Sequence, residues 1–180
     1  MTTAVPARER VHTVVDSPIG PLTLVAADGA LVGLYLAEQR HRPSEEFFGA
    51  PDPEPFAGVR EQLAEYFAGR RTVFDVPLAP VGTPFQQKVW RALLEIPYGR
   101  TVSYGQLAAR IGSPSASRAV GLANGRNPIS IIVPCHRVVG SSGDLTGYGG
   151  GLERKKWLLA LERGAAGRAE QLSLLDPAAR

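Results

Sequence analysis

Short apolar runs open the chain and predict β-strands. The runs cover Val11–Val15, Leu22–Ala26 and Leu31–Leu36, and the Asp28-Gly29 pair between the second and third runs is a turn signal. Because hairpin-linked strands pair antiparallel, we expect these runs to form a small antiparallel meander at the start of the fold.

A helical period follows the strands. Apolar side chains recur at helical spacing across Phe56–Ala68, and Gly69 supplies a stop. The next segment, Arg71–Val76, predicts one more strand, and the run PLAPVG at residues 77–82 is the best candidate for a linker. Residues 1–82 are therefore predicted to form an α/β domain with a small antiparallel sheet and a helix.

From residue 83 onward the pattern is mainly helical. Thr83 and Pro84 are a helix cap and a first-turn proline, and they predict a helix over Phe85–Ile96. Three further helices are predicted, at Tyr104–Ile111 with Ser103 as its cap, at Ser117–Asn124, and at Leu152–Arg163 with a stop at Gly164. The two short helices flank the turn SPSAS, which is typical of a helix-turn-helix whose second helix lies on DNA. We expect a mainly α domain over residues 83–164 and a tail over residues 165–180.

The second helix of this motif, SRAVGLAN, carries small residues at Ala119, Gly121 and Ala123. Their side chains cannot reach far toward base edges, but they let a backbone approach a groove closely. This predicts binding that does not depend on base sequence. Well-packed helices of an ordinary α subdomain would give the same pattern.

Composition and charge narrow the class of protein. The 180 residues are 44% hydrophobic and 21% charged, which is ordinary globular composition. No window reaches the ~18 consecutive apolar residues of a spanning helix, and no signal-peptide pattern opens the chain, so we expect a cytoplasmic protein without membrane contact. Residues 1–82 carry 7 basic and 11 acidic side chains, whereas residues 83–165 carry 11 basic and 4 acidic ones. A basic second half suits a polyanion such as nucleic acid, although solvated surface charge would look the same.

The chain has one cysteine, Cys135, which excludes an intramolecular disulfide and a multi-cysteine zinc site. It follows the run Ile131–Val133, which predicts a buried strand. A free thiol has a pKa of ~8.5, so a reactive one needs a base or a positive charge nearby. His136 is adjacent, but neighbours on an extended strand point to opposite faces, so coupling would need a bend or a water molecule. Glu162 could orient the imidazole. An inert thiol, a core histidine and a surface carboxylate are the alternatives.

The motif PCHRV, an upstream RNP and a downstream YGGGLERKKWLLALE resemble the O6-alkylguanine-DNA alkyltransferases of the single-protein bacterial type. The resemblance covers residues 83–163 closely, and the first half is similar to the family's ribonuclease H-like α/β domain in its pattern of elements. It implies direct-reversal DNA repair without a cofactor. The protein would bind duplex DNA through the minor groove, turn O6-alkylguanine out of the stack and transfer the alkyl group irreversibly to Cys135. Each molecule would then react once.

The resemblance also implies roles for the residues around the thiol. Cys135 is similar to the alkyl acceptor, and His136 to the base that deprotonates it through a bridging water. Glu162 would hold the imidazole. Asn127 is similar to the asparagine that braces the turn before the active site.

Further matching residues would contact the DNA. Arg118 is similar to the arginine that enters the duplex where the damaged nucleotide leaves the stack. Tyr104 resembles the tyrosine that crowds the 3′ phosphate and offers a proton to guanine N3. The other implied DNA-binding and base-binding residues are Ser103, Ala119, Gly121, Val138, Tyr148 and Gly149. The carbonyls of Cys135 and Val138 would receive the exocyclic amine of guanine, and the backbone N–H of Gly149 would meet O6. Some relatives carry serine in place of this glycine.

Metal, partners and rival functions complete the expectations. The zinc site of some relatives needs cysteines that are absent here, with only His12 and His41 available, so we expect no zinc. We expect a monomer.

The pentapeptide Gln171-Leu172-Ser173-Leu174-Leu175 resembles the peptide by which bacterial repair and replication proteins dock on the sliding clamp. The alternative is that its leucines pack on the parent fold. The rival functions are an alkyltransferase-like DNA-binding protein without transfer, which Cys135 argues against, a cysteine hydrolase and a transcriptional regulator.

Overall fold

The apolar runs at the start of the chain form the strands that they predict. In the computed structural model, which describes residues 9–175 and side chains up to Arg168, β1 (Arg10–Val15), β2 (Leu22–Ala27) and β3 (Ala30–Leu36) pair antiparallel in chain order. A short strand, β4 (Ala50–Pro51), joins the other edge of β1 in parallel, which gives the order β3-β2-β1-β4. The three predicted runs form the antiparallel meander that was expected, and β4, which was not predicted, adds a parallel pair at its edge.

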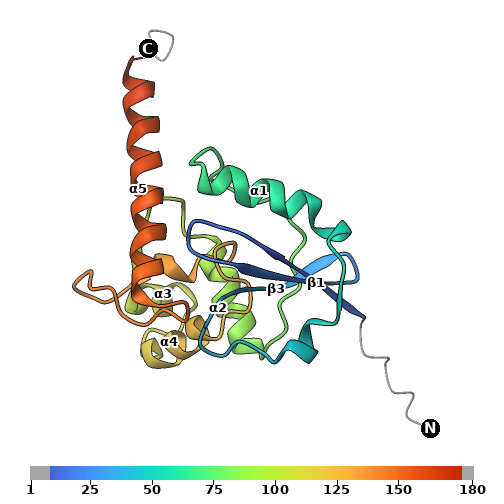
Figure 1. Cartoon of the computed structure of the whole chain (residues 1–180). Helices are drawn as coiled ribbons and strands as arrows, with labels where there is room; N and C mark the ends of the chain where they lie inside the picture. The colour runs from blue at the N-terminus through green and yellow to red at the C-terminus, as the bar shows by residue number, and fades with distance from the viewer. Residues whose placement is uncertain (1–8, 176–180) are drawn as a thin grey trace.

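One helix covers this sheet (Figure 1). After the 3-10 turns Glu45–Phe48 and Glu54–Phe56, α1 (Ala57–Phe67) buries its apolar stripe against the core. The strand expected at Arg71–Val76 does not form. The side chain of Gln62 takes both backbone groups of Asp75 instead, at 2.8 and 2.9 Å, and this removes the ladder partners that a strand would need.

The second half is helical, and its predicted caps are present. In α2 (Pro84–Leu94), Thr83 and Gln86 form a capping box. The same box starts the next helix, where Ser103 is the cap and Gln106 the third residue. The elements that follow α2 are β5 (Val102–Ser103), α3 (Tyr104–Arg110), α4 (Ser117–Gly125), the 3-10 turn η3 (Cys135–Arg137), and β6 (Val138–Val139), which pairs in parallel with β5. Helices α3 and α4 are the predicted helix-turn-helix pair, and they pack directly on each other.

The strand predicted at Ile131–Val133 is a compact turn. Its backbone bonds are local, from Ile132 N to Ser130 O and from Val133 N to Ile129 O, and Ile131 has a φ of 72°. A β-branched residue adopts positive φ only where the surroundings impose it. Apolar periodicity alone cannot distinguish such a buried turn from a short buried strand.

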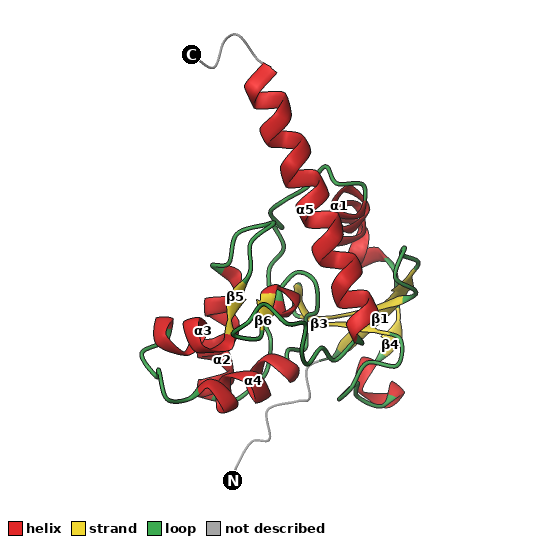
Figure 2. Ribbon diagram, turned by 90° about the vertical axis from the view of Figure 1, so that its left-hand side faces the viewer, coloured by secondary structure: helices red, strands yellow, loops and turns green. Residues whose placement is uncertain are grey.

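The last helix is longer than its glycines suggest. Helix α5 (Leu152–Leu175) continues through Gly164, where a stop was expected, and projects beyond the rest of the fold (Figures 1 and 2). A glycine inside a helix costs only about 1 kcal/mol relative to alanine. Contacts offset that cost, because Ala165 is buried and packs close to Gly69.

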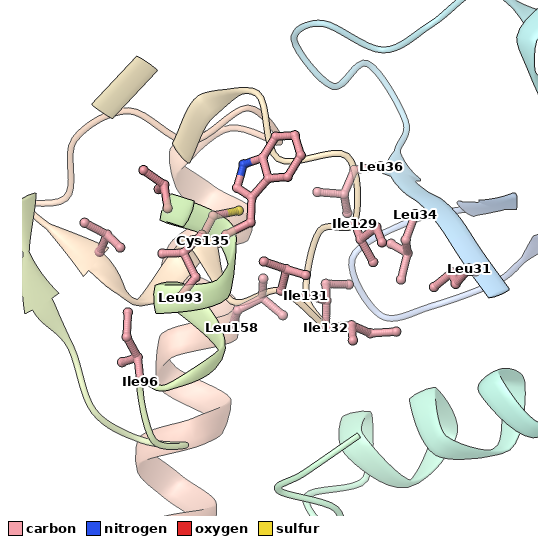
Figure 3. Packing of buried hydrophobic residues seen from close by; sticks show 14 of the residues in the cluster. Leu31, Leu34, Leu36, Leu93, Ile96, Ile129, Ile131, Ile132, Cys135 and Leu158 are labelled. Carbon is pink, nitrogen blue, oxygen red and sulfur yellow. The ribbon is translucent and has the colours of Figure 1, made fainter. Parts of the chain in front are cut away.

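A single apolar cluster joins the two halves of the chain. Leu31 and Leu34 come from β3, Leu93 from α2 and Leu158 from α5, and Cys135 lies within the same cluster (Figure 3). Backbone bonds cross the same boundary, from Leu34 N to Pro128 O at 2.8 Å and from Ser130 N to Leu34 O at 3.1 Å. The turn before the cysteine therefore rests on the sheet. Over the described residues, none of the helices has the length and apolar character to cross a membrane.

Candidate active site

The cysteine lies on a tight turn rather than on an extended strand. Residues Cys135–Arg137 form the 3-10 turn η3, which supplies the bend that coupling of Cys135 to His136 requires. The thiol is buried, with 5% of the residue exposed. Burial raises the pKa of Cys135, whereas the side chain of Asn127 and the charge of Lys155 act in the opposite direction. The thiol is therefore protonated at neutral pH and needs a base to become a nucleophile.

His136 is the adjacent candidate base. Its imidazole is fully buried, and Nε2 lies 2.7 Å from Oε1 of Glu162. Since a carboxylate can only accept, Nε2 carries the proton and Nδ1 keeps its lone pair. This Nδ1 is buried and has no hydrogen-bond partner among residues 9–175. Burial lowers the pKa of His136 despite the opposing pull of Glu162, so the imidazole is neutral and able to accept a proton.

Glu162 is a buried carboxylate, and the surface alternative is excluded. Arg137 donates to both of its oxygens, each at 2.9 Å. Gly99 N donates to Oε2 at 3.3 Å, and the Tyr66 hydroxyl donates to Oε1 at 2.8 Å. Burial alone would raise the pKa of Glu162, but His136 and Arg137 outweigh it and lower the pKa to about 2. The carboxylate therefore stays charged and fixes the imidazole.

Asn127 braces the turn before the cysteine, as the resemblance implies. Its Nδ2 donates to Val133 O at 2.8 Å, and its Oδ1 accepts from Ile129 N at 3.0 Å. A side chain that satisfies both ends of a turn fixes the turn without a strand partner. This explains how the chain reaches Cys135 in a single geometry.

Lys155 is fully buried behind the cysteine. Its Nζ donates to Val138 O at 2.6 Å and to Thr146 O at 2.9 Å, which ties the segment after Cys135 to the glycine-rich loop. Burial lowers the pKa of Lys155 to about 8, and the charge of the cysteine opposes this. The carbonyl of Val138, which we expected to receive the guanine amine, thus already has one donor and keeps one lone pair.

Two tyrosines, Tyr104 and Tyr148, lie near the thiol. The hydroxyl of Tyr104 donates to Thr146 O at 3.1 Å and to Gly147 O at 3.3 Å. The hydroxyl of Tyr148 is buried and has no partner in the described part of the chain. Burial raises the pKa of both tyrosines, and the nearby Cys135 raises them further. Both hydroxyls therefore remain donors at neutral pH.

The glycine-rich loop is held against the N-terminal half. The carbonyl of Gly149 accepts from Arg40 N at 2.8 Å. A Cβ on Gly149 would lie 3.5 Å from Gln39 Cγ, which is ordinary contact, so the serine of some relatives would fit here. Arg154 adds a second tie, because its guanidinium donates to carbonyls of both halves, at Ala37 and Gly150.

Helix α4 presents the predicted DNA-binding residues to a groove. This groove has a volume of about 1260 Å³, and its walls include Tyr104, Arg118, Gly121, Tyr148 and Gly149. Arg118 and Ala119 are exposed on the helix and Gly121 is partly exposed. Ser103, by contrast, uses its hydroxyl to cap α3, at 3.1 Å from Gln106 N. Cys135 is buried and is not among the residues that line this groove.

One small residue of α4 faces the interior. Ala123 is buried, and its carbonyl accepts from Trp90 Nε1 at 2.9 Å. The expectation that Ala123 helps α4 approach a groove was wrong, because the helical period turns this position toward α2. Leu122, which is 69% exposed, takes a place on the outer face instead.

Several residues of the site have no role in the sequence reasoning. Lys155, Tyr66 and Arg137 contact the site in the fold but are not among the residues that the sequence singles out. For the lysine a signal exists, since it shares a helical face with Leu158 and Glu162 at spacings of three and seven. For Tyr66 no local signal exists, because 96 residues separate it from its partner.

The two histidines outside the site do not assemble a metal centre. His12 uses Nδ1 for a hydrogen bond to Gly49 O, and His41 lies on the loop after β3. Within residues 9–175, no group of three or more histidine, cysteine, aspartate or glutamate side chains has the arrangement of a metal site.

The fold and the site define a class of protein: a cysteine nucleophile with a His–Glu pair, set beside a helix-turn-helix. Comparison with known proteins identifies the family. Residues 84–164 match the DNA-binding domain of the 6-O-methylguanine DNA methyltransferases, and residues 11–80 match their ribonuclease-like domain. The chain belongs to this family, and the expected two-part fold, with a ribonuclease-like first half and a helical second half, is confirmed.

Individual relatives agree along nearly the whole chain. The chain is 58% identical over 165 residues to proteins named methylated-DNA--protein-cysteine methyltransferase from Mycobacterium bovis and Mycobacterium tuberculosis, covering 92% of this chain and 98% of theirs. The crystal structure of M. tuberculosis OGT in complex with DNA has a TM-score of 0.81 and 56% identity, covering 86% of this chain and 94% of that one.

Proposed function

We propose that the chain repairs DNA by direct reversal, transferring the alkyl group of O6-alkylguanine in duplex DNA to Cys135. The observation that carries this function is the neutral imidazole of His136. Its Nε2 is fixed by Glu162, its Nδ1 has no hydrogen-bond partner among residues 9–175, and the residue directly follows the buried Cys135 on the turn η3. The α4 groove and the names of the relatives support the same function.

The step balances in atoms and charge. His136 Nδ1 takes the proton of Cys135, directly or through water, and the thiolate attacks the alkyl carbon. An S–C bond forms as the C–O6 bond breaks, and the electron pair passes to the guanine. The Tyr104 hydroxyl then donates a proton to N3, for which it must leave the carbonyls of Thr146 and Gly147, and the proton that His136 took returns to the Tyr104 phenolate through solvent. The thioether has no good leaving group, so each molecule reacts once.

Several residues of the resemblance are part of this proposal. Arg118 would fill the space that the flipped nucleotide leaves, and Ala119 and Gly121 would let α4 lie in the minor groove. Tyr148 and the backbone N–H of Gly149 would line the base pocket. Since Cys135 is buried and does not line the groove, a base could reach the thiol only after the lining of the groove moves.

Protein mass after reaction tests the proposal. The protein is incubated with a duplex that contains O6-methylguanine and with the same duplex unmodified. We expect a gain of 14 Da on Cys135 with the modified duplex only, none in Cys135→Ser, and one methyl group removed per protein. Binding of the lesion without mass gain would indicate an alkyltransferase-like protein. Repeated turnover without mass gain would indicate a hydrolase, and sequence-selective binding without transfer would indicate a regulator.

The proposal also covers the location in the cell, the oligomeric state, the domain boundaries and a candidate protein partner. We infer a cytoplasmic monomer with units at residues 1–82 and 83–164. The clamp-like pentapeptide Gln171–Leu175 lies in the last turns of α5, where the side chains fall outside the described residues. Clamp docking therefore stays a prediction, and weaker clamp binding by Gln171→Ala than by the wild type would support it.

A further inference from the structure

The N-terminal half contributes a hydroxyl to the centre of the site. Tyr66 lies in the last turn of α1 and is fully buried. Its hydroxyl donates to Oε1 of Glu162 at 2.8 Å across 96 residues of sequence. Burial raises the pKa of Tyr66 well above its usual value, so this hydroxyl keeps its proton and remains a donor. The contact therefore connects a helix of the first domain to the carboxylate that holds the candidate base.

We propose that Tyr66 is a positioning residue for the proton relay at Cys135. Its hydroxyl fixes the same carboxylate oxygen, Oε1 of Glu162, that binds His136 Nε2. This inference deepens the proposed alkyl transfer and rests on it for its kinetic test. It assigns the N-terminal half a part in the chemistry, in addition to its support of the fold.

The crowding of donors on one oxygen determines the expected effect. Oε1 accepts from Tyr66, His136 and Arg137 at 2.8, 2.7 and 2.9 Å. Each donor withdraws negative charge from the oxygen and limits its motion. Without the tyrosine hydroxyl, Oε1 presents more negative charge to the imidazole, which stabilises imidazolium and raises the pKa of His136. A larger fraction of His136 is then protonated and cannot take the thiol proton. A less restrained carboxylate also holds the imidazole, and with it Nδ1, less firmly in place.

Tyr98 provides a matched control in the same aromatic cluster. The rings of Tyr66 and Tyr98 are 6.1 Å apart and edge to face. The Tyr98 hydroxyl is also buried, but among residues 9–175 it has no hydrogen-bond partner. Tyr66→Phe and Tyr98→Phe thus each remove one buried hydroxyl from the same aromatic cluster and keep the ring, and only the first removes a hydrogen bond to Glu162.

Kinetics form the first arm of the test. Single-turnover transfer from an O6-methylguanine duplex is followed between pH 5.5 and 8.5 for the wild type, Tyr66→Phe and Tyr98→Phe, together with affinity for an unmodified duplex. For Tyr66→Phe we expect transfer about tenfold slower near pH 6, an acidic limb moved to higher pH, and unchanged DNA affinity. Tyr98→Phe should follow the wild type. Equal rates and pH profiles in the wild type and Tyr66→Phe would overturn the proposal, as would equal losses in both variants.

NMR titration of the imidazoles forms the second arm and needs no alkyl transfer. The chain has three histidines, so replacing His12 and His41 identifies the signal of His136. We expect a higher His136 pKa in Tyr66→Phe than in the wild type or Tyr98→Phe, and the same value in all three proteins would overturn the inference. If the wild type gains no methyl group, the proposed function fails, while this arm still decides whether Tyr66 tunes the imidazole.

Discussion

Behind Cys135, donors from Tyr66, Gly99, His136 and Arg137 converge on one buried carboxylate. In front of it, the groove along α4 is bordered by exposed side chains and by a glycine-rich loop. The carboxylate and its donors, here called the rear of the site, are hydrogen-bonded in the protein alone, whereas in the proposed function the α4 groove, here called the front, has to admit a base. We therefore expect substitutions in the rear to change the rate of alkyl transfer on every substrate. Front substitutions should alter only what happens on duplex DNA.

The largest effect is expected from Glu162→Gln. The amide keeps the shape of the carboxylate but removes its charge, which leaves Arg137 buried without a counter-ion. Breaking a buried pair in this way costs about 3–5 kcal/mol. Urea denaturation measures the free energy of unfolding, and Glu153→Gln on the exposed side of α5 is the control, with an expected change within about 0.5 kcal/mol. Equal midpoints for the two variants would contradict the picture of a preorganised rear.

The pH dependence of the free energy of unfolding gives a second test of the buried carboxylate. The pKa of Glu162 is about 2 in the fold, against 4.5 for an ordinary glutamate. Between these values the unfolded chain binds more protons than the fold, so stability is present above pH 4.5 and falls as the pH drops toward 2. This group contributes a slope of up to about 1.4 kcal/mol per pH unit. Unfolding measured at several pH values should show that slope in the wild type and a shallower one in Glu162→Gln.

Sequence reasoning succeeds where the determinants are local. The capping boxes at Thr83 and Ser103 depend on residues three apart, and both form. It fails where distant residues decide. The turn before Cys135 is fixed by Asn127 and by bonds to β3, so its apolar run resembles a strand. The continuation of α5 past Gly164 likewise depends on packing against another part of the chain.

The residues of the candidate site also fall into two groups, those that the sequence identifies and those that only the fold brings together. The motif PCHRV identifies Cys135 and His136 from adjacent residues, and Glu162 is a candidate from its place on the last predicted helix and from the resemblance. Other residues of the site are distant from this motif in sequence. Tyr66 lies on the first domain's helix and Lys155 on the last helix, so only the fold brings Tyr66 to Glu162 and Lys155 to the segment after Cys135.

Lys155→Met removes a buried positive charge near Cys135, and we expect it to have the next largest effect. The variant loses a cation that lowers the pKa of Cys135 and leaves two buried carbonyls without their donor. Since one pKa unit corresponds to a factor of ten, we expect transfer at pH 7 to slow by about 10- to 100-fold. The loss should be equal on duplex DNA and on the free O6-methylguanine nucleoside. The adjacent, exposed Lys156 provides the control, because Lys156→Met should react at the wild-type rate.

Arg118→Ala tests the front. The side chain is exposed at the start of α4, and in the proposed function it takes the place of the extruded nucleotide. We expect transfer on the duplex to slow by about tenfold, since unstacking loses its compensation, with no change on the free nucleoside. Arg118→Lys separates shape from charge, and full recovery there would show that charge alone is sufficient. A loss on the free nucleoside would contradict the division between front and rear.

The smallest effect is expected from Leu122→Ala. Leu122 lies one turn after Arg118 on α4, is 69% exposed and lines the α4 groove, so it would contact DNA that enters this groove. Partial burial of the side chain against sugar and base edges is worth about 1 kcal/mol, so the truncation should weaken duplex affinity about fivefold. Leu94→Ala, exposed on α2 and outside the α4 groove, is the control. Equal affinity of Leu122→Ala and the wild type would place this face of α4 outside the DNA contact. Slower transfer to the free nucleoside would instead show that the front reaches the chemistry.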